Sequence, residues 1–411
     1  MSLDVHAALN SVSDYESAAR KLLPPGLFPV LFGSYGDSGW EANTHNLDGL
    51  RDVELRPRVM VDVSSIDTTT TVLGTAISVP IITAPAGLHL RFHADGEPAT
   101  ARGTADAGSL MILSTAASYS IEEIAALDAG PRWFQLYCFK DRGLTADLVR
   151  RAEAAGYGAI VVTVDNPGVR SRERDHRHGF DWHGQGNVAT LPADRILRNF
   201  HGLEGPTIPT AESFHANFET ALDWSYFDWL QDLTPLPFVI KGVQAVGDAI
   251  EAVNRGARGL VVSNHGGHAL HDTVATISTL PDVADAVGDA AEVYLDGGIR
   301  RGIDVLKCLA LGVRAVLIGR AYLWGLTVDG RAGVTDVYDL LRDELQVAMA
   351  YLGVADVKQV SRSFVAGGRN ATSVASELRE FATLTDQGYL TREEFDALKQ
   401  SLLSAARPRH G

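Results

Sequence analysis

Short apolar runs rich in β-branched residues recur along the chain and alternate with Ala-rich stretches of helical periodicity. Eight runs occur, at 79–85, 110–114, 133–139, 159–165, 237–242, 259–264, 293–298 and 315–320. Runs that are apolar throughout are typical of parallel strands covered on both faces. A helix that ends in glycine before the next strand is typical of βα units. Eight such units favour an α/β fold with the sheet closed into a (β/α)8 TIM barrel. The competing open doubly wound sheet is disfavoured, since no GxGxxG follows the first run.

The regions outside these repeats divide the chain further. Residues 1–75 precede the barrel and predict a helical segment that closes it or shapes the site. Residues 76–365 predict the barrel, and its long connection 166–236, rich in His, Asp, Asn, Pro and aromatic residues, is typical of an active-site loop. Residues 376–405 predict a helical hairpin too small to fold alone, in which Thr391 caps the second helix with Glu394 as its capping-box partner.

Composition argues against several classes of partner. The net charge of −15 disfavours nucleic acid or an anionic membrane surface as the main partner. No run reaches the ~18 apolar residues that a membrane span needs, and the first residues lack the pattern of a signal peptide. Both cysteines, Cys138 and Cys308, lie in apolar runs and predict buried thiols, which suits a reducing compartment. We therefore expect a cytoplasmic protein.

The carboxyl ends of barrel strands carry the chemistry in this fold class. Here these ends are mostly polar and are expected to converge on one rim. Imidazole titrates near neutral pH, and His265 is the histidine that falls at a strand end, so we expect it to be a base. Asp165, at another strand end, is expected to orient the imidazole and stabilise its protonated form.

Five segments at these positions carry a resemblance to a known family. They are FQLY at 134–137, TVDNP at 163–167, SNHGG at 263–267, LDGGIRRGIDVLK at 295–307 and VLIGR at 316–320. Over residues 14–365 the chain resembles the FMN-dependent 2-hydroxy-acid oxidases and dehydrogenases, which include glycolate oxidase, lactate oxidase and mandelate dehydrogenase. The resemblance implies FMN as cofactor, His265 and Asp165 as a catalytic pair with Tyr137 beside them, and a homotetramer or larger assembly.

Further strand-end residues are expected to bind the cofactor. A buried cation at Lys241 would stabilise negative charge on the reduced flavin, and the resemblance places it beside the N1–C2=O edge. The alternative for Lys241 is an ion pair with Asp165 or another rim carboxylate. Glycines and arginines after the seventh and eighth strands suit the FMN phosphate. The candidate cofactor contacts are Ala86, Gly87, Ser114, Gln135, Thr163, Lys241, Ser263, Asp296, Gly297, Gly298, Arg300, Gly319 and Arg320.

The chain departs from the family at positions that face the substrate. Where the family has an arginine that clamps the substrate carboxylate, the chain has His268, and a histidine cannot form that forked pair. Val30 and Ala116 align with a tyrosine and a tryptophan, which enlarges the pocket. Tyr137 and Arg172 are further candidate substrate contacts. We therefore expect a bulkier substrate, or one without a free carboxylate beside the reacting carbon.

Together with the missing arginine, the segments LDGGIRRGIDVLK at 295–307 and VLIGRAYLWGL at 316–326 resemble the branch that contains the mycofactocin-maturation flavin enzyme. This resemblance implies a small-molecule or peptide-derived substrate. Three alternatives stay open. They are an ordinary 2-hydroxy-acid oxidase with a different carboxylate anchor, a flavin-dependent isomerase, and a flavin-binding scaffold without activity. The His265–Asp165 pair disfavours the last two. We expect no metal site, since no cysteine or regular carboxylate pattern accompanies His265, His268 and His271, or His176, His178 and His183.

Overall fold

The computed structural model describes residues 9–24, 28, 44–167, 195, 197–200, 214–268, 270, 272–366, 381–382, 385 and 390–405. Val30 and Arg172, two candidate substrate contacts, lie outside these ranges. The chain divides into two units, Met1–Phe364 and Val365–Gly411. No helix in the described part of the chain has both the length and the apolar character needed to cross a bilayer.

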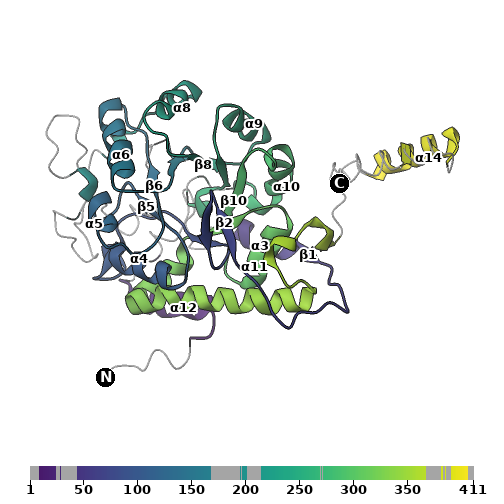
Figure 1. Cartoon of the computed structure of the whole chain (residues 1–411), viewed down its shortest axis with the longest axis horizontal. Coiled ribbons are helices and arrows are strands. Elements are labelled where there is room, and N and C mark those ends of the chain that lie inside the picture. The colour runs from purple at the N-terminus through teal and green to yellow at the C-terminus, as the bar shows by residue number, and fades with distance from the viewer. Residues whose placement is uncertain are drawn as a thin grey trace. The chain divides into compact units, whose positions relative to one another are not determined.

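Eight parallel strands form a closed barrel in the first unit (Figure 1). Around the barrel they follow the order β10-β11-β4-β5-β6-β7-β8-β9, so that the last strand in sequence pairs with the first. Each strand overlaps one of the apolar runs, which confirms the predicted fold. Their bounds are β4 Ile81–Thr83, β5 Met111–Ser114, β6 Arg132–Leu136, β7 Ile160–Thr163, β8 Phe238–Val243, β9 Gly259–Val262, β10 Glu292–Asp296 and β11 Ala315–Ile318.

A helix follows every barrel strand. Several of these helices begin at side chains that accept hydrogen bonds from the first turn: Ser120 caps α5, Asp141 caps α6 and Asp223 caps α8. The helices are α4 Gly96–Asp106, α5 Ile121–Ala125, α6 Arg142–Ala154, α8 Trp224–Gln231, α9 Val246–Asn254, α10 Thr276–Val287, α11 Gly302–Ala310 and α12 Arg320–Leu352.

The strand register brings the polar strand ends into one layer. Ser114 pairs with Gln135, and Thr163 pairs with Lys241. Below this layer the barrel interior is filled with apolar side chains, because alternate residues of each strand point inward. The buried core there includes Ile82, Ile112, Trp133, Val161, Val239, Val261, Tyr294 and Leu317.

A hairpin of two short strands, β2 Thr70–Val72 and β3 Thr75–Ile77, closes the amino-terminal end of the barrel. Val72 and Ile77 join the barrel core, and the backbone N–H of Leu73 donates to Glu292 at the start of β10. We expected residues 1–75 to form helices that close the barrel or shape the site. At 70–77 the hairpin closes the barrel instead, because the residues there are β-branched and the Leu73-Gly74 turn takes positive φ at both residues.

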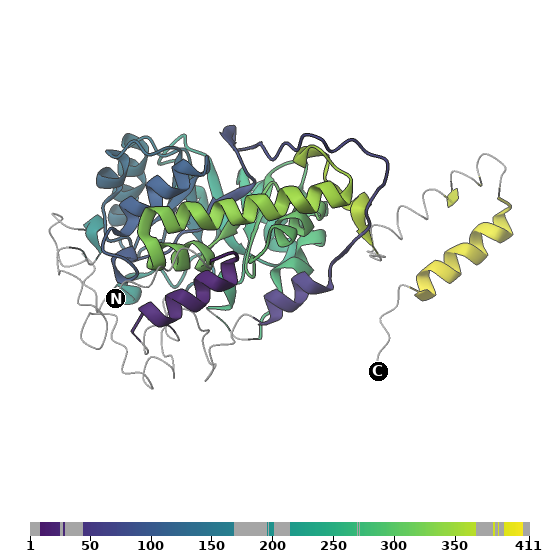
Figure 2. The ribbon, with the colours of Figure 1, turned by 90° about the horizontal axis from the view of Figure 1, so that it is seen from below.

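In the described part of the chain before the hairpin lie the helices α1 Val12–Leu22 and α3 Thr44–Asp52, followed by the short strand β1 Glu54–Leu55. Helix α1 packs against the long helix α12 (Figure 2), where the hydroxyl of Tyr15 donates to Asp336 at 2.8 Å. The described part of the N-terminal region is therefore anchored on the outside of the barrel.

The second unit contains helix α14, Arg392–Ala405. Thr391 Oγ1 accepts the N–H of Glu394 at 3.2 Å, and Glu394 accepts the N–H of Thr391 at 2.8 Å, so the predicted capping box is confirmed. The predicted first helix of the hairpin lies largely outside the described residues.

Candidate active site

A cavity of about 610 Å³ lies at the carboxyl ends of the barrel strands, where the sequence predicted the site. Three candidate residues, Gln135, Thr163 and Ser263, are buried and do not line it. Gln135 bonds to Ser114 and Ser263 bonds to Lys241, both of which line the cavity, and Thr163 bonds to Gln135. The candidates that line the cavity are Ala86, Gly87, Ser114, Ala116, Tyr137, Asp165, Lys241, His265, His268, Asp296, Gly297, Gly298, Arg300, Gly319 and Arg320.

An imidazole and a carboxylate meet at the edge of this cavity. His265 Nδ1 lies 2.9 Å from Asp165 Oδ1. His265 follows β9 and Asp165 follows β7, and β8 runs between these strands. On β8, a Cβ at Gly242 would lie 2.7 Å from Asp165 Cβ, so glycine there leaves room for the carboxylate. The barrel thus brings together two residues one hundred positions apart.

The backbone at His265 is in the left-handed region, which a histidine seldom adopts. His265, Gly266 and Gly267 form a 3-10 turn with φ values of 58°, 63° and 70°. Two hydrogen bonds hold the turn: the N–H of His265 donates to Ser263 Oγ, and Asn264 Oδ1 accepts the N–H of Gly267. Such strain persists where the surroundings fix it, and it is concentrated at functional sites.

The charges around Asp165 keep it ionised. Burial opposes its negative charge, but His265 and Lys241 outweigh burial and hold the pKa of this carboxyl below its usual value. An ionised Asp165 accepts the Nδ1 proton of the imidazole, which leaves Nε2 as the nitrogen able to take up a proton. The pair therefore has the arrangement of a general base with an orienting carboxylate.

Lys241 is buried at the end of β8 and lies between two acceptors. Its Nζ forms an ion pair with Asp296 Oδ2 at 2.8 Å and donates to Ser263 Oγ at 3.0 Å. Burial disfavours the charged amine, but Asp296 and Asp165 outweigh it and raise the pKa of Lys241 above its usual value. The ion pair that we considered as an alternative is therefore present, with Asp296 as partner, and the ammonium still lines the cavity.

A chain of hydrogen bonds crosses three neighbouring strand ends. Ser114 Oγ donates to Gln135 Oε1 at 3.2 Å, and Gln135 Nε2 donates to Thr163 Oγ1 at 3.1 Å. All three side chains are buried. The chain fixes the orientation of the Gln135 amide, so the polar rim is ordered before any ligand binds.

The corner after β10 and β11 suits an anion. Gly297 and Gly298 have φ values of 101° and 89°, and a Cβ at Gly297 would lie 2.6 Å from Asn46 Nδ2, so only glycine fits. Arg300 and Arg320 line this corner, and Arg320 is the first residue of α12. Two guanidinium groups beside a helix N-terminus are an arrangement that binds phosphate groups.

Aromatic side chains form another wall of the cavity. Phe214 and His215 line it together with Tyr137. Tyr137 stacks on Phe218 at 4.6 Å between ring centroids, and Phe214 lies edge-on to Phe218 at 4.9 Å. These phenylalanines come from the long connection after β7, which the sequence predicted as an active-site loop with Arg172, but neither phenylalanine, as a candidate substrate contact.

His268 also lines the cavity, beside the candidate base. Its ring centroid lies 6.4 Å from that of His265, with an angle of 29° between the rings. The residue that replaces the arginine expected from the resemblance therefore lines the same cavity as the candidate base. Among the described residues, no group of three or more histidine, cysteine, aspartate and glutamate side chains is placed to hold a metal ion.

Sequence reasoning missed Asn46, a buried residue of α3. Its amide exchanges two hydrogen bonds with the amide of Asn264, at 2.9 and 3.0 Å, and accepts the N–H of Thr276 at 3.1 Å. It thereby supports the turn that carries His265. No motif surrounds Asn46 in the sequence, so only the packing of α3 against the barrel identifies it.

The model of a family described as FMN-dependent dehydrogenase matches residues 19–367. The chain belongs to this family of FMN-dependent 2-hydroxy-acid oxidases and dehydrogenases. Among its relatives, an L-lactate oxidase from Nostoc sp. is 43% identical over 363 residues, which are 86% of this chain and 96% of that protein. Glycolate oxidase from Spinacia oleracea is 40% identical over 364 residues, 87% of this chain and 96% of the relative.

Solved structures of family members have the same fold. A mandelate oxidase variant with 2-hydroxy-phenylacetamide superposes with a TM-score of 0.76 at 38% identity, covering 86% of this chain and 97% of that one. A soluble mutant of the membrane-associated (S)-mandelate dehydrogenase from Pseudomonas putida gives 0.80 at 32% identity, covering 88% and 100%. These relatives do not place the chain in the branch of the mycofactocin-maturation enzyme.

Membership of the family makes the protein an oxidoreductase whose cofactor is FMN. The residues present fit this cofactor. The carboxylate oxygen Asp296 Oδ1 is buried without a hydrogen-bond partner in the described part of the chain, next to the paired Lys241 and the anion corner. The cation Lys241 and the ordered polar rim suit an isoalloxazine ring, and Arg300 and Arg320 suit its phosphate tail.

Proposed function

We propose that the protein oxidises a carbon that bears a hydroxyl or amino group, with His265 as the base. The observation that carries this proposal is the 2.9 Å contact between His265 Nδ1 and Asp165 Oδ1 at the cavity. With Nδ1 committed to Asp165, Nε2 accepts the proton of the substrate, and the carboxylate stabilises the imidazolium that forms.

Bound FMN supplies the acceptor for the two electrons. Lys241, held as a cation by Asp296, would stabilise the negative charge that reduction of a bound flavin would place in the cavity. Tyr137 lines the cavity and is the candidate to hydrogen-bond the substrate oxygen. Gly297, Gly298 and Gly319, with Arg300 and Arg320, are the candidates to hold the phosphate.

The remaining candidate cofactor contacts are of two kinds, polar side chains that suit the flavin ring and small residues that suit its reactive edge. Ser114, Gln135, Thr163 and Ser263 are polar, buried and linked to the cavity, which suits hydrogen bonds to the flavin ring. Ala86 and Gly87 follow β4 and line the cavity, and with only a methyl group and a hydrogen on their Cα atoms their backbone could approach the flavin ring closely.

We propose further that the substrate carries an aromatic or similarly large group and needs no free carboxylate beside the reacting carbon. His268 lies beside His265, and a single imidazole cannot hold a carboxylate by two parallel bonds as a guanidinium does. Ala116 leaves space, and Phe214 and His215 offer rings for stacking. The mandelate oxidase variant was solved with 2-hydroxy-phenylacetamide, an aryl compound whose carboxylate is replaced by an amide.

A second candidate is an ordinary 2-hydroxy-acid oxidase with a different carboxylate anchor. One observation favours it: Arg91, which is 4% exposed, lines the same cavity. A guanidinium there could hold a carboxylate that His268 cannot. Under this alternative, Arg91→Met would abolish turnover of small acids and spare that of amides.

The test is anaerobic bleaching of the FMN-loaded protein with four probes: glycolate, L-lactate, mandelate and 2-hydroxy-phenylacetamide. We expect the two aryl compounds to reduce the flavin rapidly, and glycolate and L-lactate to reduce it far more slowly. Reduction by L-lactate at a rate equal to that with mandelate would overturn the proposal for the substrate. Failure of His265→Ala to slow the reduction would overturn the proposal for the base.

A further inference from the structure

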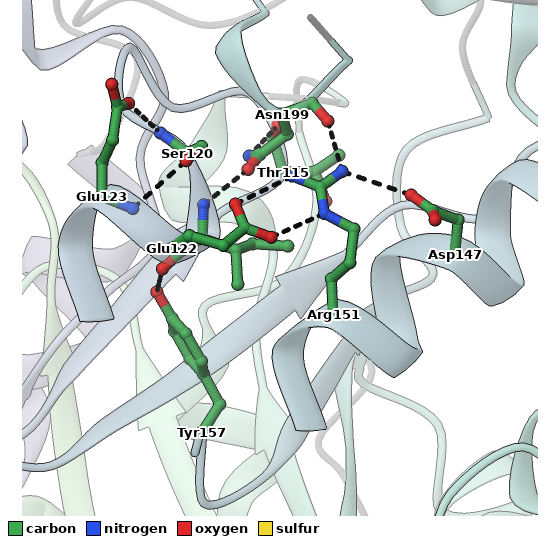
Figure 3. A network of polar contacts seen from close by, with 9 residues as sticks. Thr115, Ser120, Glu122, Glu123, Asp147, Arg151, Tyr157 and Asn199 are labelled. Carbon is green, nitrogen blue, oxygen red and sulfur yellow. Dashed lines mark hydrogen bonds and ion pairs between the residues drawn. The ribbon is translucent and has the colours of Figure 1, made fainter. Parts of the chain in front are cut away.

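Asn199 is fully buried and joins separate parts of the barrel rim through its amide (Figure 3). It lies in the 3-10 helix η4, Arg198–Phe200, in the connection between β7 and α8. Its Nδ2 donates to the carbonyl oxygen of Thr115 at 2.9 Å, and its Oδ1 accepts the N–H of Ile121 at 2.9 Å. One amide therefore spans the turn between the end of β5 and the start of α5.

Thr115, whose carbonyl oxygen accepts this bond from Asn199, also forms hydrogen bonds to β6. Its N–H donates to Gln135 Oε1 at 3.1 Å, and its Oγ1 donates to the carbonyl oxygen of Gln135 at 2.6 Å. The N–H of Tyr137 in turn donates to Thr115 Oγ1 at 3.1 Å. Tyr137 lines the cavity, as do both neighbours of Thr115, Ser114 and Ala116. A displacement of Thr115 would therefore move three cavity-lining residues.

Arg151 of α6 connects Asn199 to the outside of the barrel. Its Nη1 donates to the carbonyl oxygen of Asn199 at 2.7 Å, and its Nε and Nη2 donate to Glu122 at 2.7 and 3.0 Å. Figure 3 shows this guanidinium between Asn199 and the carboxylates of Glu122 and Asp147. The carboxylates are partly exposed, so these ion pairs contribute little by themselves. The buried amide provides the constraint on the turn.

We propose that Asn199 is a positioning residue for the active site. Asn199 holds Thr115 in position, and through Thr115 it positions Ser114, Ala116 and Tyr137 around the flavin and the substrate. The inference rests on the proposed function, since it assumes that the reaction takes place in this cavity. The competing explanation is that Asn199 only stabilises the fold, as any buried and satisfied amide does.

The experiment compares three variants of the full-length, FMN-loaded protein. Asn199→Ala removes the amide, and Thr115→Val removes the hydroxyl that carries its effect to Tyr137. Tyr157→Phe is the matched control, because the hydroxyl of Tyr157 is buried in the same network but donates to the carbonyl oxygen of Ile121 at 3.0 Å, at the α5 end of the turn, and not to Thr115. The readouts are the melting temperature, the FMN dissociation constant, the visible circular dichroism of bound FMN and the rate of flavin reduction by mandelate.

We expect all three variants to melt at lower temperatures than the wild type. Asn199→Ala and Thr115→Val are expected to alter the circular dichroism of FMN and to slow flavin reduction by about 10- to 100-fold, because small displacements of positioning groups have effects of that size. Tyr157→Phe should keep the wild-type spectrum and a rate within about threefold. If all three variants slow the reaction in proportion to their loss of stability, Asn199 has no positioning role.

A double variant provides a check that does not depend on any single variant. Asn199→Ala and Thr115→Val act on one path, so their effects on the reduction rate should fall well short of multiplying, whereas those of Thr115→Val and Tyr157→Phe should multiply. Full multiplication in the first pair would overturn the proposal. Should mandelate fail to reduce the wild type, the proposed substrate fails, while FMN binding and circular dichroism still decide the role of Asn199.

Discussion

On one side of the cavity, ionisable side chains at the ends of β7 to β10 hold one another in place. His265 bonds to Asp165, and Lys241 bonds to Asp296 at 2.8 Å. On the aromatic side, Tyr137, Phe214 and Phe218 contact one another as rings, without charges. Removing one member of a buried charged pair leaves the other uncompensated, whereas packed rings accept exchange at modest cost. Substrate recognition can therefore change while the redox chemistry stays fixed.

The largest effect is expected at His265. His265→Ala should slow flavin reduction by about 10²- to 10⁴-fold, the usual contribution of a general base, and leave FMN bound. Stopped-flow measurement with the best substrate and a titration with FMN would separate the two properties. A rate within tenfold of the wild type would mean that another group takes the proton.

Lys241→Met tests how much the Lys241–Asp296 ion pair contributes to the stability of the charged side of the cavity. The variant leaves Asp296 buried without its cation, so the free energy of unfolding should fall by about 3–5 kcal/mol. Urea unfolding measures this loss. Adding Asp296→Leu to the variant should restore most of the stability but not FMN reduction. A single variant as stable as the wild type would contradict the assigned pair.

Glu97, in the first turn of α4, has a buried carboxyl group. It accepts hydrogen bonds from the backbone N–H groups of His89 and Ser118, at 3.1 and 2.7 Å. Burial raises the pKa of Glu97 to about 7. The native state therefore keeps a proton that the unfolded chain releases near pH 4.3, and stability falls as the pH rises from there to about 7.

Glu97→Gln keeps the acceptor oxygen and removes this ionisation. The variant should be more stable than the wild type at pH 8, by up to about 3 kcal/mol, and equally stable at pH 4. Urea unfolding at the two pH values measures the difference. A difference that does not change with pH would show that Glu97 is ionised throughout, and that an unpaired buried carboxylate is tolerated here.

The smallest effect is expected at His268. His268→Arg should raise the rate of flavin reduction by L-lactate by about tenfold, because a guanidinium can hold a carboxylate by two parallel hydrogen bonds and a single imidazole cannot. The ratio of rates for mandelate and 2-hydroxy-phenylacetamide should move toward the acid. An unchanged ratio would mean that His268 does not face the acid or amide group of the substrate.

The charged side of the cavity could be predicted from the sequence, and the aromatic side could not. Parallel strands in a barrel bring their carboxyl ends to one rim, so residues such as Lys241 and His265 are found by counting strands. The partner of Lys241 was not fixed by this rule, since carboxylates follow several strands. Phe214 and Asn199 lie in a long connection whose path depends on tertiary contacts, and no periodicity marks them.

In the fold, too, the repeated elements could be predicted and the elements that depend on tertiary packing could not. The eight apolar runs predicted all eight barrel strands, because each run is apolar on both faces. The β2–β3 hairpin was missed, although the β-branched run at 68–72 and the Leu73-Gly74 pair are signals for it. Asn46 was also missed, because its role arises where α3 packs against the barrel.

A crystal structure of the protein with FMN bound tests the central claim most directly. We predict an isoalloxazine ring in the cavity with Lys241 at one edge and the imidazole of His265 over its face, and a phosphate at Gly297, Gly298 and Arg320. A ring bound elsewhere, or one separated from His265 by packed apolar side chains, would contradict this arrangement.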